Sequence, residues 1–383
     1  MVVTYKELQD KSMRNSIRVM FSRASVMARE DSGFKRFAPD SRNLHEDSLM
    51  PDSRDMSPQD RTFLYIQPEP EPGQIGTAGF DLRIGRLIAK SDVVMERVTK
   101  QDLLEMPHTV LEPGQEYVLK NNEDGGRIYY MISFEKIGLS SDLEILVDSK
   151  STTGRVGCMS HGVGRTEEGE LITALQPFAF PLKVTCGKTR LSQTAVRYKG
   201  TPYMTNEEIL ESEEVRFGGD GTSLQGSLNP KGLLIQFNTQ RVYRAKQNDR
   251  PINMDAEGTL NWEDYFELIE GNSQLVLDKK TLYLLGSLGA IDLGEVCGLL
   301  SREQEVMTGT GAWGHFAGIL QPFFRGGITM EFYSHSKRRL SRGDKAGIVI
   351  FDKIQGVINR PENYGGSYQD QRPPLLPKMF RKE

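Results

Sequence analysis

Several residue types that define other protein classes are scarce in this sequence. Cysteine occurs only at positions 158, 186 and 297 of 383 residues, and these positions form no CxxC pair. Such isolated cysteines argue against a disulfide framework and against a cysteine-based zinc site. The chain also has no apolar run of membrane-spanning length, and its net charge of −4 gives no broad basic field for nucleic acid. We therefore expect a cytoplasmic protein that binds neither membranes nor nucleic acid.

Short apolar runs separated by turn residues are abundant. Runs such as 129–132, 143–147 and 189–198 alternate with glycine, Asp-Gly and proline turns. This pattern of short apolar runs and turns is typical of all-β proteins. After the first 60 residues, the only helices that we expect are short, over 206–214 and 262–269. The fold class that we predict is therefore all-β.

An internal repeat is visible in the sequence after the first 60 residues. Residues 79–88 resemble residues 232–242 in their apolar pattern. Further along, Ile172-Thr-Ala-Leu resembles Ile328-Thr-Met-Glu, and each is followed by a glycine turn and a strand pattern, at Gly187 and Gly343. The last two correspondences have the same sequence offset, which favours two homologous β units over a chance likeness.

The repeat and the composition suggest a domain organisation. The first 60 residues are polar and end in a stretch rich in Asp, Ser, Arg and Pro, which indicates a helix followed by a loosely ordered connector. A glycine-rich stretch between the repeats has the composition of a linker. The predicted parts are an N-terminal extension over 1–60 with a helix at 5–29, a first repeat over 61–217, and a second over 218–383 that begins with the linker 218–226.

The segment 148–157, Asp-Ser-Lys-Ser-Thr-Thr-Gly-Arg-Val-Gly, has the composition of a phosphate-binding loop. It combines three hydroxyls at Ser151, Thr152 and Thr153 with the cations Lys150 and Arg155. A triphosphate needs convergent N–H and O–H donors together with positive charge. The order of a Walker A loop is absent. The alternative is a solvated turn.

Glu331 is the candidate general base. If 328–333 is a strand, alternation places Glu331 on the polar face of an otherwise apolar segment. A carboxylate in that position can activate a water, although an ordinary cross-strand charge gives the same pattern. The first repeat has Leu175 at the matching position, or Ala174 after a one-residue slip, and its nearest rival carboxylate is Glu170. We therefore predict one composite site, with phosphate donors from the first repeat and the carboxylate from the second.

Two more segments are candidates for substrate contact. Residues 313–324 mix aromatic residues, glycines and a proline without a period, which is typical of a loop that encloses a base or of a buried strand crossing. Residues 364–376 place two glycines before an amide-rich run. Such a tail can close over a ligand, or it can be a frayed terminus.

Taken together and in this order, these segments resemble the dCTP deaminase and dUTPase superfamily, and in particular a tandem-repeat bacterial branch of the dCTP deaminases. The resemblance covers residues from about 61 to 383. The motifs that carry it are Asp81-Leu-Arg83, Ser149 to Gly157, Gln321-Pro-Phe-Phe, Met330-Glu331-Phe332 and Tyr368-Gln-Asp-Gln371. The resemblance implies dUTPase-like distorted β-barrels of jelly-roll type, packed as in a trimer within a homo-oligomer.

The same resemblance implies deamination of dCTP to dUTP and ammonia, in the supply of pyrimidine deoxynucleotides. A glutamate-activated water attacks C4 of cytosine without zinc, and Mg²⁺ accompanies the triphosphate. In agreement, the sequence lacks the HxE…PCxxC pattern of zinc deaminases. The partners implied are dCTP and dUTP.

By position, Glu331 takes the role of the general base, with Ser151 and Arg155 as catalytic partners that hold phosphate or orient the water. The resemblance assigns substrate contacts to Lys150, Thr152, Ala317, Gln321, Tyr368 and Gln371. Three positions depart from the family pattern, which more often has Asp at 321, Lys at 367 and Arg at 150.

The sequence is also compatible with two other functions. The same fold hydrolyses dUTP to dUMP and pyrophosphate, alone or together with deamination. The tail of this chain does not match the glycine-rich, Arg-bearing terminal motif of dUTPases. A non-catalytic nucleotide-binding regulatory module is the second alternative, and the departures at Gln321 and Ser367 motivate it.

Overall fold

The computed structural model describes most of the two predicted repeats. The described residues are 2–3, 64–68, 70–71, 73–121, 127–139, 141, 143–271, 273–301, 312–314, 316–334, 336–355, 368–372 and 374–381. The helix predicted over 5–29 lies outside them, as does most of the predicted 1–60 extension. No helix within the described residues is long and apolar enough to cross a membrane.

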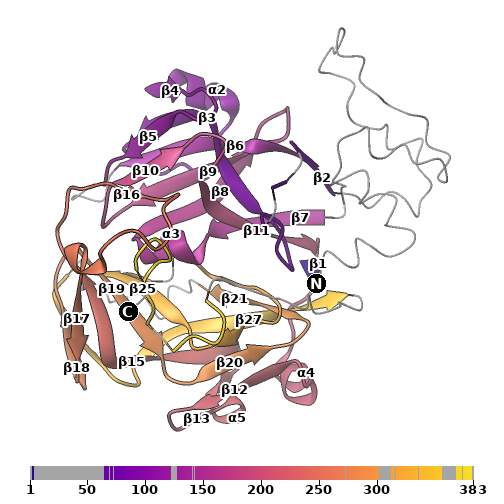
Figure 1. Cartoon of the computed structure of the whole chain (residues 1–383). Helices are drawn as coiled ribbons and strands as arrows, with labels where there is room; N and C mark the ends of the chain where they lie inside the picture. Colours follow the sequence, from indigo (N-terminus) through magenta and orange to yellow (C-terminus); the bar gives the residue numbers. More distant parts are fainter. Residues whose placement is uncertain are drawn as a thin grey trace.

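The first repeat is a curled β unit, coloured purple to magenta in Figure 1. Its long strands pair in the order β3, β6, β9 and β8, and β11 pairs with both β3 and β7. Its elements are β2 (Leu64–Gln67), β3 (Asp81–Ser91), α2 (Lys100–Glu105), β4 (His108–Val110), β5 (Glu116–Leu119), β6 (Ile128–Leu139), β7 (Leu143–Ser149), α3 (Ser151–Arg155), β8 (Cys158–Arg165), β9 (Glu170–Pro177), β10 (Leu182–Thr185) and β11 (Arg190–Tyr198).

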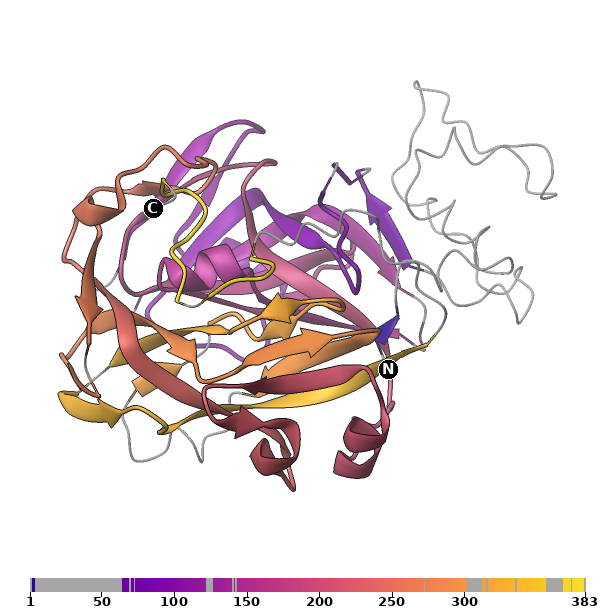
Figure 2. The same cartoon turned by 60° about the horizontal axis from the view of Figure 1, so that its bottom comes forward.

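The second repeat is also a curled β unit, coloured from rose through orange to yellow. Figure 2 shows it packed beside the first repeat. Its first elements are α4 (Asn206–Glu211), β12 (Val215–Gly219), β13 (Thr222–Ser223), α5 (Leu224–Ser227), β14 (Leu228–Asn229), β15 (Gly232–Ala245), β16 (Ile252–Asn253), η4 (Trp262–Asp264) and β17 (Phe266–Glu270). They are followed by β18 (Gln274–Leu277), β19 (Thr281–Ser287), β20 (Ala290–Leu293), β21 (Val296–Ser301), β22 (Ala312–Gly314), β23 (Ile319–Leu320), β24 (Arg325–Gly326), β25 (Thr329–Ser334), β26 (Arg338–Ser341) and β27 (Lys345–Gln355).

Strand pairing confirms the internal repeat. In the first repeat β3 pairs with β6, β6 with β9, and β11 with β3 and β7. In the second, β15 pairs with β19, β19 with β25, and β27 with β15 and β21 in the same way. A short strand, β1 (Val2–Val3), pairs with both β11 and β27. The prediction of two tandem all-β units is therefore confirmed.

One hydrophobic core is shared between the repeats. It combines Leu175, Phe178 and Phe180 of the first repeat with Tyr243 and Phe266 of the second, all of them buried. Burying one such aromatic side chain stabilises the fold by roughly 2–3 kcal/mol. Each repeat also has a core of its own. This division explains why every residue of β25 is buried, because one face of the strand packs inside its repeat and the other packs against the first repeat.

Two of the predicted local structures are wrong. The helix predicted over 262–269 is only the single turn η4, and β17 follows because it pairs with β15 and buries Phe266 in the shared core. The glycine-rich stretch 218–226 is not a linker. It forms the β12–β13 hairpin, whose turn has positive φ angles at Asp220 and Gly221, and continues into α5.

The helix predicted over 206–214 is present but shorter, as α4. Thr205 accepts the N–H of Glu208, and the Glu208 side chain accepts the N–H of Thr205, which forms a capping box at the start. The backbone becomes extended at Ser212. Val215 then begins β12, which pairs with β20, so tertiary strand pairing ends the helix early.

Candidate active site

The helix α3 carries the predicted phosphate segment and lies between the two repeats (Figure 1). Its residues Thr152, Thr153, Gly154 and Arg155 are buried. At Gly154 a Cβ atom would stand 3.1 Å from Cδ of Glu331 and 3.2 Å from Cβ of Ala317. The second repeat therefore presses on α3 so closely that glycine is the residue that fits best there. The structure brings the two predicted halves of the composite site into contact.

Glu331 is a buried carboxyl group on β25. Its side chain is only 1% exposed, and its Oε2 has no hydrogen-bond partner among the described residues. Burial raises the pKa of Glu331 to about 7, although Arg155 and the N–H of Ala317 act in the opposite direction. A carboxyl group that titrates near neutral pH is suited to both accepting and returning a proton.

Arg155 lies beside Glu331 and binds the C-terminal tail. Its Nη1 donates to the carbonyl of Leu375 and its Nη2 to Oε1 of Gln371, each at 3.0 Å. The guanidinium also stacks on the ring of Tyr368, 3.6 Å from its centroid. Burial lowers the pKa of Arg155, but a guanidinium remains charged at neutral pH. Arg155 thus joins the tail to the general-base candidate.

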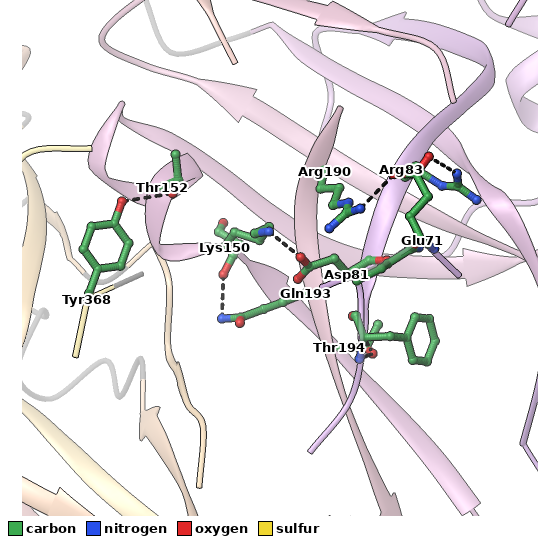
Figure 3. A network of polar contacts seen from close by, with 12 residues as sticks. Glu71, Asp81, Arg83, Lys150, Thr152, Arg190, Gln193, Thr194 and Tyr368 are labelled. Carbon is green, nitrogen blue, oxygen red and sulfur yellow. Dashed lines mark hydrogen bonds and ion pairs between the residues drawn. The ribbon is translucent and has the colours of Figure 1, made fainter. Parts of the chain in front are cut away.

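The described part of the tail closes directly over α3. The hydroxyl of Tyr368 lies 2.9 Å from Oγ1 of Thr152 (Figure 3) and accepts the N–H of Lys378 at 3.2 Å. Gln371 donates from Nε2 to the carbonyl of Gly327 at 2.6 Å. The structure thus places Tyr368 and Gln371, both named from the sequence, on the predicted phosphate segment.

Lys150 and Ser151 stand at the start of α3, and both are half-buried. Lys150 forms an ion pair with Asp81 of β3, which is visible in Figure 3. Arg83, two residues further along β3, pairs instead with the buried Glu135 at 2.6 Å. The two charged residues of the Asp81-Leu-Arg83 motif therefore have different environments, and only Asp81 touches the phosphate segment.

Gln321 is a contact between the repeats. Its Oε1 accepts the N–H of Ala78 at 3.0 Å and the hydroxyl of Thr77 at 3.1 Å. These atoms belong to the loop that precedes β3, so the amide joins the second repeat to the first. The predicted contact of Gln321 with substrate stays a prediction. Ala317 is half-buried, and its backbone N–H favours the ionised form of Glu331, which lowers the pKa of that carboxyl group.

The rival carboxylate Glu170 lies elsewhere. It is bound by the hydroxyl of Thr166, and its own N–H donates to that hydroxyl at 3.0 Å, at the start of β9. At the other end of β9, Leu175 belongs to the core shared by the repeats, whereas Ala174 packs in the first repeat's own core. Leu175 therefore faces the second repeat, just as Glu331 faces the first. The position in the first repeat that corresponds to Glu331 is thus apolar.

Asp148 is a site residue to which the sequence analysis assigned no role. Its Oδ2 accepts the N–H of Gly318, beside Ala317, at 2.7 Å. The available signal was its position at the end of a strand, next to the phosphate segment. Its partner lies 170 residues away, which no local pattern reveals.

The described residues contain no group of three or more His, Cys, Asp or Glu side chains placed to hold a metal ion. Besides Glu331, the carboxylates beside α3 are those of Asp81 and Asp148, and both already have partners, since Asp81 pairs with Lys150 and Asp148 accepts backbone N–H groups. The described part of the chain therefore offers no ready set of carboxylate ligands, and a divalent cation here would depend on oxygens from a bound ligand.

Comparisons with known proteins identify the family and the fold. Residues 56–193 match the family model described as dCTP deaminase-like. Residues 204–341 match the model of the 2'-deoxycytidine 5'-triphosphate deaminase C-terminal domain. A search of curated proteins gave no match. Among solved structures, 2'-deoxycytidine 5'-triphosphate deaminase from Agrobacterium tumefaciens has the same fold, with a TM-score of 0.64 and 20% identity over 76% of this chain and 93% of that chain.

Proposed function

Because the chain belongs to the dCTP deaminase family, we propose that it hydrolyses dCTP to dUTP and ammonia, with Glu331 as the general base. The observation that carries the proposal is the position of Glu331, a buried carboxyl group with a pKa near 7 that is pressed against Gly154 of the other repeat and stabilised in its ionised form by the charge of Arg155. The paired family models support the substrate, and the local geometry supports the role of the carboxylate.

The proposed chemistry needs one group that moves protons. Ionised Glu331 takes a proton from water, and the resulting hydroxide attacks C4 of cytosine. Glu331 passes this proton to N3 of the ring, then takes the proton of the new C4 hydroxyl and delivers it to the amino group, which leaves as ammonia while the C4 carbonyl forms. Water and dCTP thus yield dUTP and ammonia, and Glu331 returns to its starting state. Arg155 supplies a fixed positive charge that favours the ionised carboxylate.

The triphosphate is proposed to lie at the start of α3. Lys150 provides charge there, and Ser151 and Thr152 provide hydroxyl donors. Mg²⁺ is proposed to arrive with the nucleotide as part of the substrate, held mainly by phosphate oxygens. No side chain of the site is assigned to the metal, because Asp81 and Asp148 already have other partners.

The tail is proposed to cover the bound nucleotide. In this structure both Nη atoms of Arg155 donate to tail acceptors, and Thr152 contacts Tyr368. Substrate entry therefore requires these contacts to open or rearrange, and their re-formation excludes water from the reaction. A trimer-like homo-oligomer remains part of the proposal, and light scattering on the purified chain tests it.

The test is to incubate the protein with dCTP or dUTP and Mg²⁺ and to resolve the products. We expect ammonia and dUTP from dCTP. Release of dUMP and pyrophosphate would identify a diphosphatase, and binding without a product would identify a regulatory module. Glu331→Gln should lower kcat by at least about 10³-fold while nucleotide binding is retained. The matched control Glu170→Gln should keep its activity, and a fully active Glu331→Gln protein would overturn the assignment.

A further inference from the structure

Asp148 joins the two repeats beside the proposed active site. It is the second-last residue of β7, and both of its carboxylate oxygens accept backbone N–H groups. Oδ1 accepts the N–H of Ser149 at 2.8 Å, and Oδ2 accepts the N–H of Gly318 at 2.7 Å. One carboxylate therefore holds the start of the α3 segment in the first repeat and the segment before β23 in the second.

The contact requires an unusually close approach of the second repeat. A Cβ atom on Gly318 would stand 2.9 Å from Oδ2 of Asp148 and 2.9 Å from the carbonyl oxygen of Leu300. Real Cβ atoms essentially never come this close, and one of the two atoms is rigid backbone. The N–H of residue 318 thus reaches Asp148 only because that residue is glycine.

The segment that Asp148 holds, at Ala317 and Gly318, lies next to the carboxyl group of Glu331. Ala317, which precedes Gly318, has its Cβ 3.2 Å from the position of a Cβ on Gly154, and Cδ of Glu331 lies 3.1 Å from the same position. The N–H of Ala317 favours the ionised form of Glu331. Fixing Gly318 therefore fixes the distance between the Ala317 N–H and the carboxylate.

Two charged groups of the described residues act on Glu331. Arg155 of α3 favours the ionised form, and Asp148 of β7 opposes it. Tyr368 of the tail stacks on Arg155. Asp148 therefore acts on Glu331 in two ways, through the geometry of the Ala317 segment and through its own charge.

We propose that Asp148 is a positioning residue for the deamination site, which aims the N–H of Ala317 at Glu331 by holding Gly318 against the first repeat. The inference rests on the proposed function. The residue does not touch the reacting atoms, so it acts through Ala317 and Glu331. The end of β7 then serves both parts of the site, since it delivers the phosphate donors of α3 and supports the general base of the other repeat.

The first test compares Asp148→Ala with Asp148→Asn. Asp148→Ala removes the acceptor for Gly318 and should lower kcat about 100-fold, since a displacement of about 1 Å costs that much. Its KM should change less than about threefold, because Asp148 does not bind substrate. Asp148→Asn keeps one oxygen for Gly318 and should restore kcat to within about tenfold of the wild type.

The matched control is Asp255→Asn. Asp255 also accepts two hydrogen bonds between sequence-distant segments, from the hydroxyls of Thr185 and Thr189, each at 2.8 Å, and it is not a contact of α3 or Glu331 in the described structure. Its kcat should remain that of the wild type. Wild-type kcat in a folded Asp148→Ala protein would overturn the proposal, and so would an Asn variant no better than Ala or an equal loss in Asp255→Asn.

A second measurement needs no turnover. Carbon-13 NMR of glutamate-labelled protein follows the Glu331 carboxyl, assigned by its absence in Glu331→Gln. Asp148→Ala should have a higher titration midpoint than Asp148→Asn, because both lack the charge but only the Ala variant releases Gly318 and the Ala317 N–H, and Asp255→Asn should leave the midpoint unchanged. Equal midpoints in Asp148→Ala and Asp148→Asn overturn the proposal even if the wild type releases no ammonia, an outcome that by itself would refute the proposed function. Should Asp148→Ala fail to fold, Gly318→Ala tests the same contact and should give the same loss of kcat.

Discussion

Glu331 of β25 and Gly154 of α3 are in direct contact across the two repeats, with Cδ of the glutamate 3.1 Å from the position of a Cβ on the glycine. The carboxylate is therefore positioned by a residue that lies 177 positions earlier in the sequence. The contact explains how a carboxylate from one repeat and a phosphate segment from the other can form a single site, and it makes the site sensitive to very small changes in volume.

Gly154→Ala tests this contact. The added methyl group should displace Glu331 or Ala317 by a few tenths of an ångström or more, and it should lower kcat by roughly 10- to 100-fold. Overpacking at a buried position should also cost about 1–3 kcal/mol of stability. Gly218→Ala is the control, because a Cβ there would meet only Thr222, at an ordinary 3.6 Å. Ammonia release and thermal melting measure both effects, and wild-type activity in Gly154→Ala would contradict the proposed geometry.

The activity should depend on pH through Glu331. The general base must be ionised, and burial raises its pKa to about 7. We expect kcat for dCTP to fall by about tenfold per pH unit below that value. Steady-state rates between pH 5 and 9 test this expectation. A profile that stays flat down to pH 5 would show that a group with an ordinary carboxyl pKa limits the reaction.

The same carboxyl group should reduce stability at high pH. Its pKa is higher in the folded state than its usual value of 4.5, so its favourable contribution is complete below pH 4.5 and is lost as the pH rises through about 7. Glu331→Gln does not titrate. Relative to wild type, it should therefore gain stability between pH 5 and pH 8, by an amount on the order of a few kcal/mol. Paired thermal melts measure the difference, and a gap independent of pH contradicts the raised pKa.

The tail should bind substrate through Tyr368. Tyr368→Phe keeps the ring on Arg155 but loses the contact with Thr152, so KM should rise roughly threefold to tenfold. Tyr368→Ala loses both contacts and should raise KM further. Tyr203→Ala is the matched control, since Tyr203 stacks on Arg197, 4.7 Å from Cζ to the ring centroid, in a different part of the molecule. Equal effects of the Tyr368 and Tyr203 variants would argue against a role for the tail.

Lys150 should discriminate the triphosphate from shorter nucleotides. Lys150→Met removes one positive charge at the start of α3 and should weaken dCTP binding by roughly 10- to 100-fold. Binding of dCMP, which lacks the outer phosphates, should change much less. Titration calorimetry with both nucleotides in the Glu331→Gln background avoids turnover. Similar losses for dCTP and dCMP would place the triphosphate elsewhere.

Local patterns were sufficient for the fold class and for singling out the segment that forms α3 between the repeats. Turn residues between short apolar runs are a local property, and so is the cluster of hydroxyls and cations from Lys150 to Arg155. They were insufficient where strand pairing competes with local preference. The local sequence of residues 262–269 favours a helix. Instead, Phe266 is buried in the shared core, and β17 pairs with β15. The glycines of 218–226 provide the positive φ angles of a hairpin rather than a linker.

The sequence by itself determined that the chain contains two β repeats, that hydroxyls and cations follow β7, and that the second repeat has a glutamate where the first has Leu175. The tertiary structure alone decided that Glu331 presses on Gly154, that Gln321 binds Ala78, and that Asp148 holds Gly318. The physical reason is the distance along the chain. Composition and alternation act over a few residues, whereas these contacts and the raised pKa of Glu331 exist only once the two repeats are packed together and water is excluded between them.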